Sequence, residues 1–181
     1  MTCWSLPAKS FCLIRHGETT ANADQIIAGI SDVPLSALGR SQAQALAMRT
    51  WPDQIALFSS PLSRARDTCT LAFPDQTYAV HNGLRERDWG VFEGRPLAEQ
   101  PDRDNTPEAG ESWPTMLARV HQSICEICAT SSDQLSVLVC HSGIIRAARV
   151  LWTTGTVGDR PPNALPLLFE KSGNKYKEKE L

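Results

Sequence analysis

The sequence lacks a surplus of basic residues and lacks any apolar run long enough to cross a bilayer. Lysine and arginine number 18 against 20 acidic residues, a net charge of −2. Proteins that bind nucleic acid by neutralising phosphates normally carry a basic excess, so we expect no nucleic-acid partner. Residues 1–10 also lack the apolar core of a secretory signal. We therefore expect no membrane association and a cytoplasmic location.

Metal ligands are scarce as well. The chain has four histidines, and its six cysteines include one C-x-x-C pair, Cys125 and Cys128. A zinc site would need further ligands at a similar spacing, and none follow. A redox-active pair usually opens a helix, whereas this pair falls late in an expected helix. These thiols are predicted to be structural, and we expect neither a metal nor another cofactor.

What the sequence does contain is the ordinary mixture of a globular protein, with 41% hydrophobic and 21% charged residues in a chain of 181. This predicts one domain over residues 1–181. Apolar runs suited to buried strands alternate with helical patterns, which predicts an α/β fold. Specifically, we expect a three-layer sandwich, with a mostly parallel central sheet and helices on both faces.

The expected strands cover residues 11–14, 55–58, 78–80 and 135–140, with an edge hairpin over 166–170 and 175–180. One expected helix begins after an N-cap at Ser36. Three further helices are expected over 63–73, 113–129 and 144–152. Between them, residues 82–111 are rich in Gly, Pro, Asp and Arg, with little periodicity. A loop of that length in a compact domain is usually functional, and we expect it to be an insertion that carries an acidic residue.

Polar clusters follow three of the expected strands: Arg15-His16-Gly17, residues 60–64 and His141-Ser142-Gly143. The active crevice of a parallel sheet lies beyond the carboxyl ends of its strands, so these clusters should converge. Arginine forks hold anions through several oxygens. A neutral imidazole beside them can attack phosphorus, and a carboxylic acid can protonate the leaving oxygen.

These motifs resemble those of the histidine phosphatase superfamily, also called phosphoglycerate-mutase-like. They occur in family order and cover most of residues 11–151. The matching segments are LIRHGETTAN (13–22), DVPLSALGRSQA (32–43), SSPLSRARDT (59–68), LRERDWGVFEG (84–94) and VCHSGIIR (139–146). Among small members, phosphatases acting on α-ribazole phosphate look most similar overall.

The resemblance implies a covalent phosphohistidine mechanism and roles for individual residues. His16 would be the nucleophile, and Glu86 would be the proton donor. Arg15, Arg64 and a protonated His141 would bind the phosphoryl group. The remaining substrate-binding residues implied are Asn22, Gly29 and Arg87.

Several assignments stay open from the sequence. Arg66 could take the place of Arg64, and Asp88 or Glu93 could be confused with Glu86. His81 and His121 match no motif and are expected at the surface or in packing. Two departures stand out in addition: Ser142 replaces a glycine frequent in the family, and Ala28 replaces a hydroxyl residue that mutases use.

The expected activity is a metal-independent phosphomonoesterase acting on a small phosphorylated metabolite, with specificity residing in residues 95–113. One alternative is a cofactor-dependent phosphoglycerate mutase, because Arg87 and Trp89 match positions that contact substrate in mutases. Another is a phosphohistidine protein phosphatase, although such proteins are shorter and lack the acid-bearing loop. A third, an inactive phospho-ligand binding module, is disfavoured because no nucleophile or arginine is lost. The sequence leaves monomer and homodimer equally open.

Overall fold

A computed structural model describes residues 4–131 and 133–181. Its centre is a six-stranded sheet in the order β3-β2-β4-β1-β5-β6. The four strands β3, β2, β4 and β1 pair in parallel, and β5 and β6 add an antiparallel edge. The strands are β1 (Phe11–Arg15), β2 (Ile55–Ser59), β3 (Ala79–Val80), β4 (Leu135–Cys140), β5 (Pro166–Ser172) and β6 (Lys175–Glu180).

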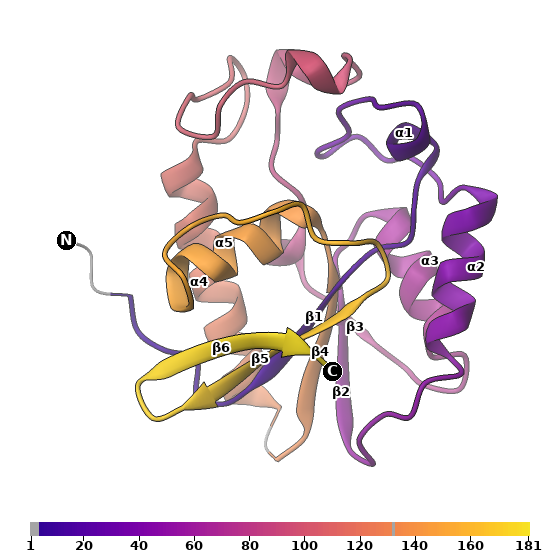
Figure 1. The fold of residues 1–181 in the computed structure, drawn as a ribbon, viewed down its shortest axis with the longest axis vertical. Helices are drawn as coiled ribbons and strands as arrows, with labels where there is room; N and C mark the ends of the chain where they lie inside the picture. The colour runs from indigo at the N-terminus through magenta and orange to yellow at the C-terminus, as the bar shows by residue number, and fades with distance from the viewer. Residues whose placement is uncertain (1–3, 132) are drawn as a thin grey trace.

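Helices cover both faces of the sheet, which confirms the predicted α/β architecture. The helices are α1 (Thr20–Ala23), α2 (Ala37–Leu46), α3 (Ser63–Ala72), α4 (Trp113–Thr130) and α5 (Ser142–Trp152). Helices α4 and α5 lie on one face, and α2 and α3 lie on the other (Figure 1). The described residues include no helix that is both long and apolar enough to span a membrane.

The alternation of side chains along β1 explains how the sheet serves two cores. Phe11 and Leu13 pack with α4 and α5, whereas Cys12 and Ile14 pack with α2 and α3. All four side chains are fully buried. Successive residues of a strand point to opposite faces, so a strand covered on both sides reads as one continuous apolar run.

Hydroxyl caps set the start of helices α2 and α4. The Ser36 hydroxyl accepts a hydrogen bond from the Gly39 amide at 3.0 Å, which confirms the predicted N-cap of α2. Ser112 caps α4 in the same way, through the Thr115 amide at 3.1 Å. Helix α2 ends at Leu46, and the side chains of Leu38 within it and Met48 just beyond it are exposed.

The segment predicted as a loop, 82–111, contains three short 3₁₀ helices: η1 (Asn82–Leu84), η2 (Gly90–Phe92) and η3 (Leu97–Glu99). Buried polar contacts hold it in place. Arg119 on α4 forms a double hydrogen bond with the Glu111 carboxylate, at 2.6 and 2.8 Å, and donates to the carbonyls of Gly83 and Arg85. The segment crosses the end of the sheet where the parallel strands finish, next to the loop that carries α1 (Figure 1).

Candidate active site

The polar clusters that follow β1, β2 and β4 meet at this end of the sheet, as predicted. The His16 amide donates to the Cys140 carbonyl at 3.0 Å, and the Ser60 amide donates to the Val139 carbonyl at 2.9 Å. The rings of His16 and His141 therefore lie side by side, with centroids 5.1 Å apart. Three segments far apart in sequence form one buried polar centre.

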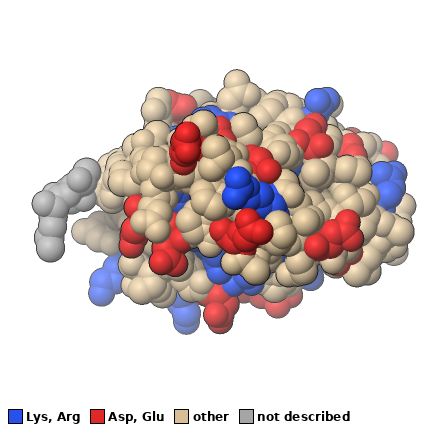
Figure 2. Space-filling model, turned by 90° about the horizontal axis from the view of Figure 1, so that it is seen from above, with Lys and Arg blue, Asp and Glu red and all other residues tan. Residues whose placement is uncertain are grey.

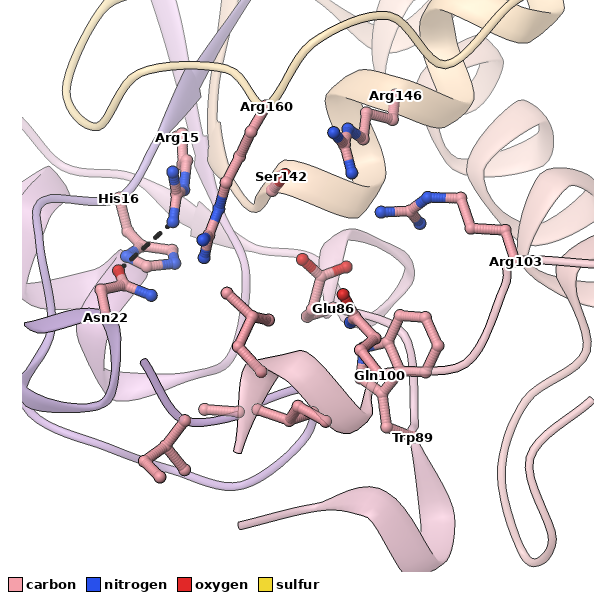
Figure 3. A pocket seen from close by; sticks show the side chains of 14 residues that line it. Arg15, His16, Asn22, Glu86, Trp89, Gln100, Arg103, Ser142, Arg146 and Arg160 are labelled. Carbon is pink, nitrogen blue, oxygen red and sulfur yellow. Dashed lines mark hydrogen bonds between the residues drawn. The ribbon is translucent and has the colours of Figure 1, made fainter. Parts of the chain in front are cut away.

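A cavity of about 150 Å³ opens beside this centre (Figure 3). Its polar lining is dominated by cations, and Glu86 is its one acidic member among the described residues. The polar lining residues are Arg15, His16, Asn22, Glu86, Gln100, Arg103, Ser142, Arg146 and Arg160. The apolar lining residues are Ile26, Ile27, Ala28, Trp89 and Leu97. Such a cavity suits a small, strongly anionic ligand.

His16 is held in the form that a nucleophile requires. Its Nδ1 lies 2.7 Å from the Gly17 carbonyl oxygen, which can only accept a hydrogen bond. Nδ1 therefore carries the proton, and Nε2 keeps its lone pair. Burial, and then the charges of Arg64 and Arg15, place the pKa of His16 well below 6.5. The ring is neutral at neutral pH and can act as a nucleophile.

His141 lies deeper than His16 and is completely buried. Its Nε2 lies 2.7 Å from the Ser60 hydroxyl, while Nδ1 has no partner among the described residues. Burial, and then Arg64, place the pKa of His141 well below 6.5. Without a bound anion, the His141 ring is therefore neutral at neutral pH, and the protonated His141 expected beside the phosphoryl group stays a prediction for the ligand-bound protein. An anion bound beside the ring would act in the opposite direction and raise this pKa.

Arg15 and Asn22 form a matched pair at the cavity wall. One Arg15 terminal nitrogen donates to the Pro161 carbonyl at 2.9 Å, and the other donates to Asn22 Oδ1 at 3.3 Å. Its Nε is buried and has no partner within the described part of the chain. Burial lowers the pKa of Arg15 to about 10, so the group remains charged at neutral pH. Figure 3 shows both side chains beside the His16 ring.

Arg64, and not Arg66, is the buried arginine of α3. Arg64 is 1% exposed, whereas Arg66 is exposed. Its guanidinium donates to the carbonyls of Ser31 and Gly29 at 2.8 and 2.6 Å. It therefore holds the loop that follows α1, and it also contributes the largest charge effect on both histidines.

The three neighbouring carboxylates have different positions. Glu86 lines the cavity, and its two oxygens accept from the amides of Gly143 and Arg87 at 2.9 and 2.8 Å. Glu93 instead faces the loop after α1 and accepts from several amides there, including that of Gly29 at 3.0 Å. Asp88 accepts from the Gly90 amide within its own turn. Glu86 alone of the three can meet a ligand in the cavity.

Four residues expected to bind substrate lie outside the cavity lining, namely Arg64, His141, Gly29 and Arg87. Arg87 is fully buried, and its side chain donates to the carbonyls of Glu111 and Asn105 at 2.9 and 3.0 Å. It therefore anchors the segment that follows η3. Gly29 approaches Arg87 so closely that a Cβ would lie 2.1 Å from the Arg87 carbonyl oxygen. Its neighbour Ala28 does line the cavity, as do Ile26 and Ile27 of the same loop.

Sequence reasoning assigned no role to three arginines and a glutamine of the lining, namely Gln100, Arg103, Arg146 and Arg160. One signal was available: Arg146 lies four residues after Ser142, so a helix beginning at Ser142 places both on one face. Gln100 and Arg103 fall in the segment expected to govern specificity. No sequence pattern points to Arg160.

The unmatched histidines and the C-x-x-C pair lie elsewhere. His81 accepts from the Gly83 amide at 3.1 Å, and His121 packs near Trp4 and Trp152. Burial raises the pKa of the Cys128 thiol to about 12, which makes it unreactive at neutral pH. Within the described ranges, no three His, Cys, Asp or Glu side chains are grouped so as to hold a metal ion.

The positive charge of the site is local. Figure 2 views the end of the molecule that carries the loops, and Lys and Arg form a small group near its centre with acidic side chains around it. Such a surface can attract a small anion, but it offers no continuous basic track.

The comparisons with known proteins agree with this geometry. Residues 11–164 match the histidine phosphatase superfamily (branch 1). The chain is 28% identical over 172 residues to a metal-independent phosphoserine phosphatase of Arabidopsis thaliana, covering 84% of this chain and 72% of the relative. It is 34% identical over 158 residues to a glucosyl-3-phosphoglycerate phosphatase of Mycolicibacterium vanbaalenii, and the match covers 75% of this chain and 70% of the relative.

A candidate alpha-ribazole-5'-P phosphatase from Escherichia coli has a similar solved structure, with a TM-score of 0.83 and 25% identity over 96% of each chain. The expected resemblance to short phosphatases is confirmed. The chain belongs to branch 1 of the histidine phosphatase superfamily and is a phosphatase.

Proposed function

We propose that the protein is a metal-independent phosphomonoesterase that hydrolyses a small phosphorylated metabolite through a phosphohistidine on His16. The observation that carries the proposal is the state of the His16 ring. The Gly17 carbonyl holds its proton on Nδ1, and Nε2 is left as a nucleophile beside Arg15 in an anion-binding cavity.

The first half of the reaction transfers the phosphoryl group. Arg15 and His141 bind the phosphoryl oxygens, with Asn22 adding a hydrogen bond and Arg64 supplying positive charge behind them. His16 Nε2 attacks phosphorus in line, and the bond between phosphorus and the leaving oxygen breaks. Glu86 gives its proton to that oxygen, so the product leaves as a neutral alcohol.

The second half returns the enzyme to its starting state. Glu86, now a carboxylate, accepts a proton from a water molecule that attacks the phosphohistidine. The phosphorus–nitrogen bond breaks, inorganic phosphate leaves, and His16 Nε2 regains its lone pair. The charges of Arg15 and Arg64 disperse the charge on the transferring group in both steps.

The donors present support metal independence. The cavity lining offers one carboxylate and one imidazole among several guanidiniums, which is a poor set for a divalent ion. The similarity to a relative named metal-independent supports the same conclusion.

The direct test is hydrolysis of p-nitrophenyl phosphate in excess EDTA. We expect sustained turnover, inhibition by vanadate, and loss of turnover in His16→Ala. Complete loss in EDTA that zinc or magnesium restores would overturn the proposal.

A phosphoglycerate mutase is the second candidate, and one observation favours it: Trp89, which matches a substrate-contacting position of mutases, does line the cavity. Two observations weigh against it. Arg87, the other matching position, is buried outside the lining, and Ala28 offers no hydroxyl to a substrate.

A further inference from the structure

Arg103 and Arg146 have no function in the proposed hydrolysis, and each holds a buried nitrogen without a partner. Arg103 Nη1 and Arg146 Nε are both buried, and neither has a hydrogen-bond partner among the described residues. A buried N–H group without a partner costs free energy, and the cost is larger when the group is charged. Two such groups in one cavity point to a ligand that satisfies them.

The two guanidiniums face each other across the cavity. Figure 3 shows Arg146, on α5, and Arg103, on the segment between η3 and α4, pointing toward one another. Burial lowers the pKa of both arginines, and the charge of Arg103 is the next largest effect on Arg146. Two cations at close range repel each other, and an anion between them would remove that repulsion.

Packing keeps Arg103 in this position. Its guanidinium carbon lies 5.2 Å from the ring centre of Trp113 and 5.9 Å from that of Trp89. These cation–π contacts hold the side chain inward. A solvated arginine would instead extend into water, where its nitrogens find partners at no cost.

The position of the pair relative to Glu86 identifies the part of the substrate that would reach it. In Figure 3, Arg103 lies on the opposite side of Glu86 from His16 and Arg15, and the Arg146 guanidinium lies above Glu86, beside that of Arg103. Glu86 protonates the leaving oxygen, so groups beyond it belong to the alcohol and not to the transferred phosphate. The same two arginines also line a second cavity of about 560 Å³, into which a larger alcohol could extend.

We propose that Arg103 and Arg146 form a second anion-binding subsite, which selects substrates whose alcohol portion carries a carboxylate or a further phosphate. This inference rests on the proposed phosphomonoesterase activity and deepens it. Arginine forks suit either group, because both present two oxygens in the same plane.

Three substrates on one carbon skeleton test it. Glycerol 3-phosphate has a neutral alcohol portion, 3-phosphoglycerate has a carboxylate in place of one hydroxymethyl group, and glycerol 1,3-bisphosphate has a second phosphate. We expect kcat/KM for at least one anionic substrate to exceed that for glycerol 3-phosphate by about tenfold to a hundredfold, the usual range for hydrogen bonds to charged groups. Whichever of 3-phosphoglycerate and glycerol 1,3-bisphosphate is preferred shows whether the subsite binds a carboxylate or a phosphate.

In Arg146→Gln, the ratio of kcat/KM for the preferred anionic substrate to that for glycerol 3-phosphate should fall at least tenfold. In the matched control Arg66→Gln, which changes an exposed arginine on α3, the ratio should not change. Arg103→Gln provides a second variant should the first fail to fold. A wild-type ratio at or below one, or a ratio unchanged in both variants, would overturn the subsite.

Binding separates this inference from the proposed function. Calorimetry on His16→Ala, which cannot form a phosphohistidine, should show tighter binding of the anionic ligand than of glycerol 3-phosphate, and Arg146→Gln should remove the difference. A protein without hydrolytic activity that still shows this difference would overturn the proposed function but keep the subsite. Hydrolysis without any difference in binding would keep the function and overturn the subsite.

Discussion

The Glu86 carboxylate sits directly against the first turn of α5, where its Oε2 accepts the Gly143 amide proton at 2.9 Å. The approach is possible only because residue 143 has no side chain: a Cβ there would lie 2.0 Å from Glu86 Oε1. The segment after η1 and the turn after β4 are thereby connected through one carboxylate. This contact places the proposed proton donor at the cavity.

Gly143→Ala should therefore lower activity in the same way as a mutation of Glu86 would. The added methyl group must displace the carboxylate, which then no longer reaches the leaving oxygen. We expect kcat to fall by about tenfold to a hundredfold, a part of the 10²–10⁴-fold that proton transfer typically contributes. Steady-state kinetics with glycerol 3-phosphate measure the effect.

A double variant distinguishes this displacement from general damage. In a Glu86→Gln background, Gly143→Ala should cost far less than it does in the wild type, because the group it displaces has already lost its function. Equal losses in the two backgrounds would show that Gly143 acts independently of Glu86.

The identity of the leaving group should govern the effect of Glu86→Gln itself. Nitrophenolate is stable without protonation, whereas an alkoxide is not. We expect kcat/KM to fall about 10²–10⁴-fold for glycerol 3-phosphate but much less for p-nitrophenyl phosphate. Equal losses on both substrates would rule out Glu86 as the proton donor and leave it a positioning role.

Stability should depend on pH through the two buried histidines. Both have pKa values well below 6.5 in the folded protein, and both return to about 6.5 on unfolding. As the pH falls below 6.5, the unfolded chain therefore binds protons that the folded protein excludes. The free energy of unfolding should decrease, by up to about 1.4 kcal/mol per pH unit for each histidine.

Urea unfolding of the wild type and of His16→Gln between pH 5 and pH 8 isolates this effect from that of the carboxylates. The stability difference between the two proteins should be constant above pH 6.5 and should change steadily below it. A difference that is independent of pH would show that the His16 pKa is not lowered.

Hydrolysis should dominate over phosphoryl return to a substrate. A mutase must keep its phosphohistidine away from water, which requires a well-covered site. Glu86 and His141 are 55 positions apart, and α4 takes 18 residues of that interval, which leaves little chain for a cover. With 3-phosphoglycerate and catalytic 2,3-bisphosphoglycerate, we expect interconversion to be far slower than hydrolysis of the best phosphomonoester. A mutase rate at or above that hydrolysis rate would favour the second candidate.

The sequence predicted those parts of the molecule that depend on local patterns. The limits of β4 match the predicted strand 135–140, because a strand covered on both faces is apolar at nearly every position, and only Ser136 here is polar. The Ser36 cap and the convergence of the clusters after β1, β2 and β4 follow from equally local rules.

The outer part of the cavity could not be predicted in this way. Arg103 and Arg160 reach it from irregular segments, whose paths depend on tertiary contacts such as that between Arg119 and Glu111. Arg87 was expected at the substrate because of its motif. Its position depends instead on the carbonyls that surround it, which no sequence spacing shows.

The central claim is that His16 Nε2 forms a covalent bond to phosphorus, and brief mixing with radiolabelled substrate tests it most directly. The account predicts a protein-bound phosphoryl group that is labile in acid and stable in alkali. The label should be absent from His16→Ala and retained in His81→Ala, whose histidine lies outside the cavity lining. Labelling that survives in His16→Ala would contradict the account.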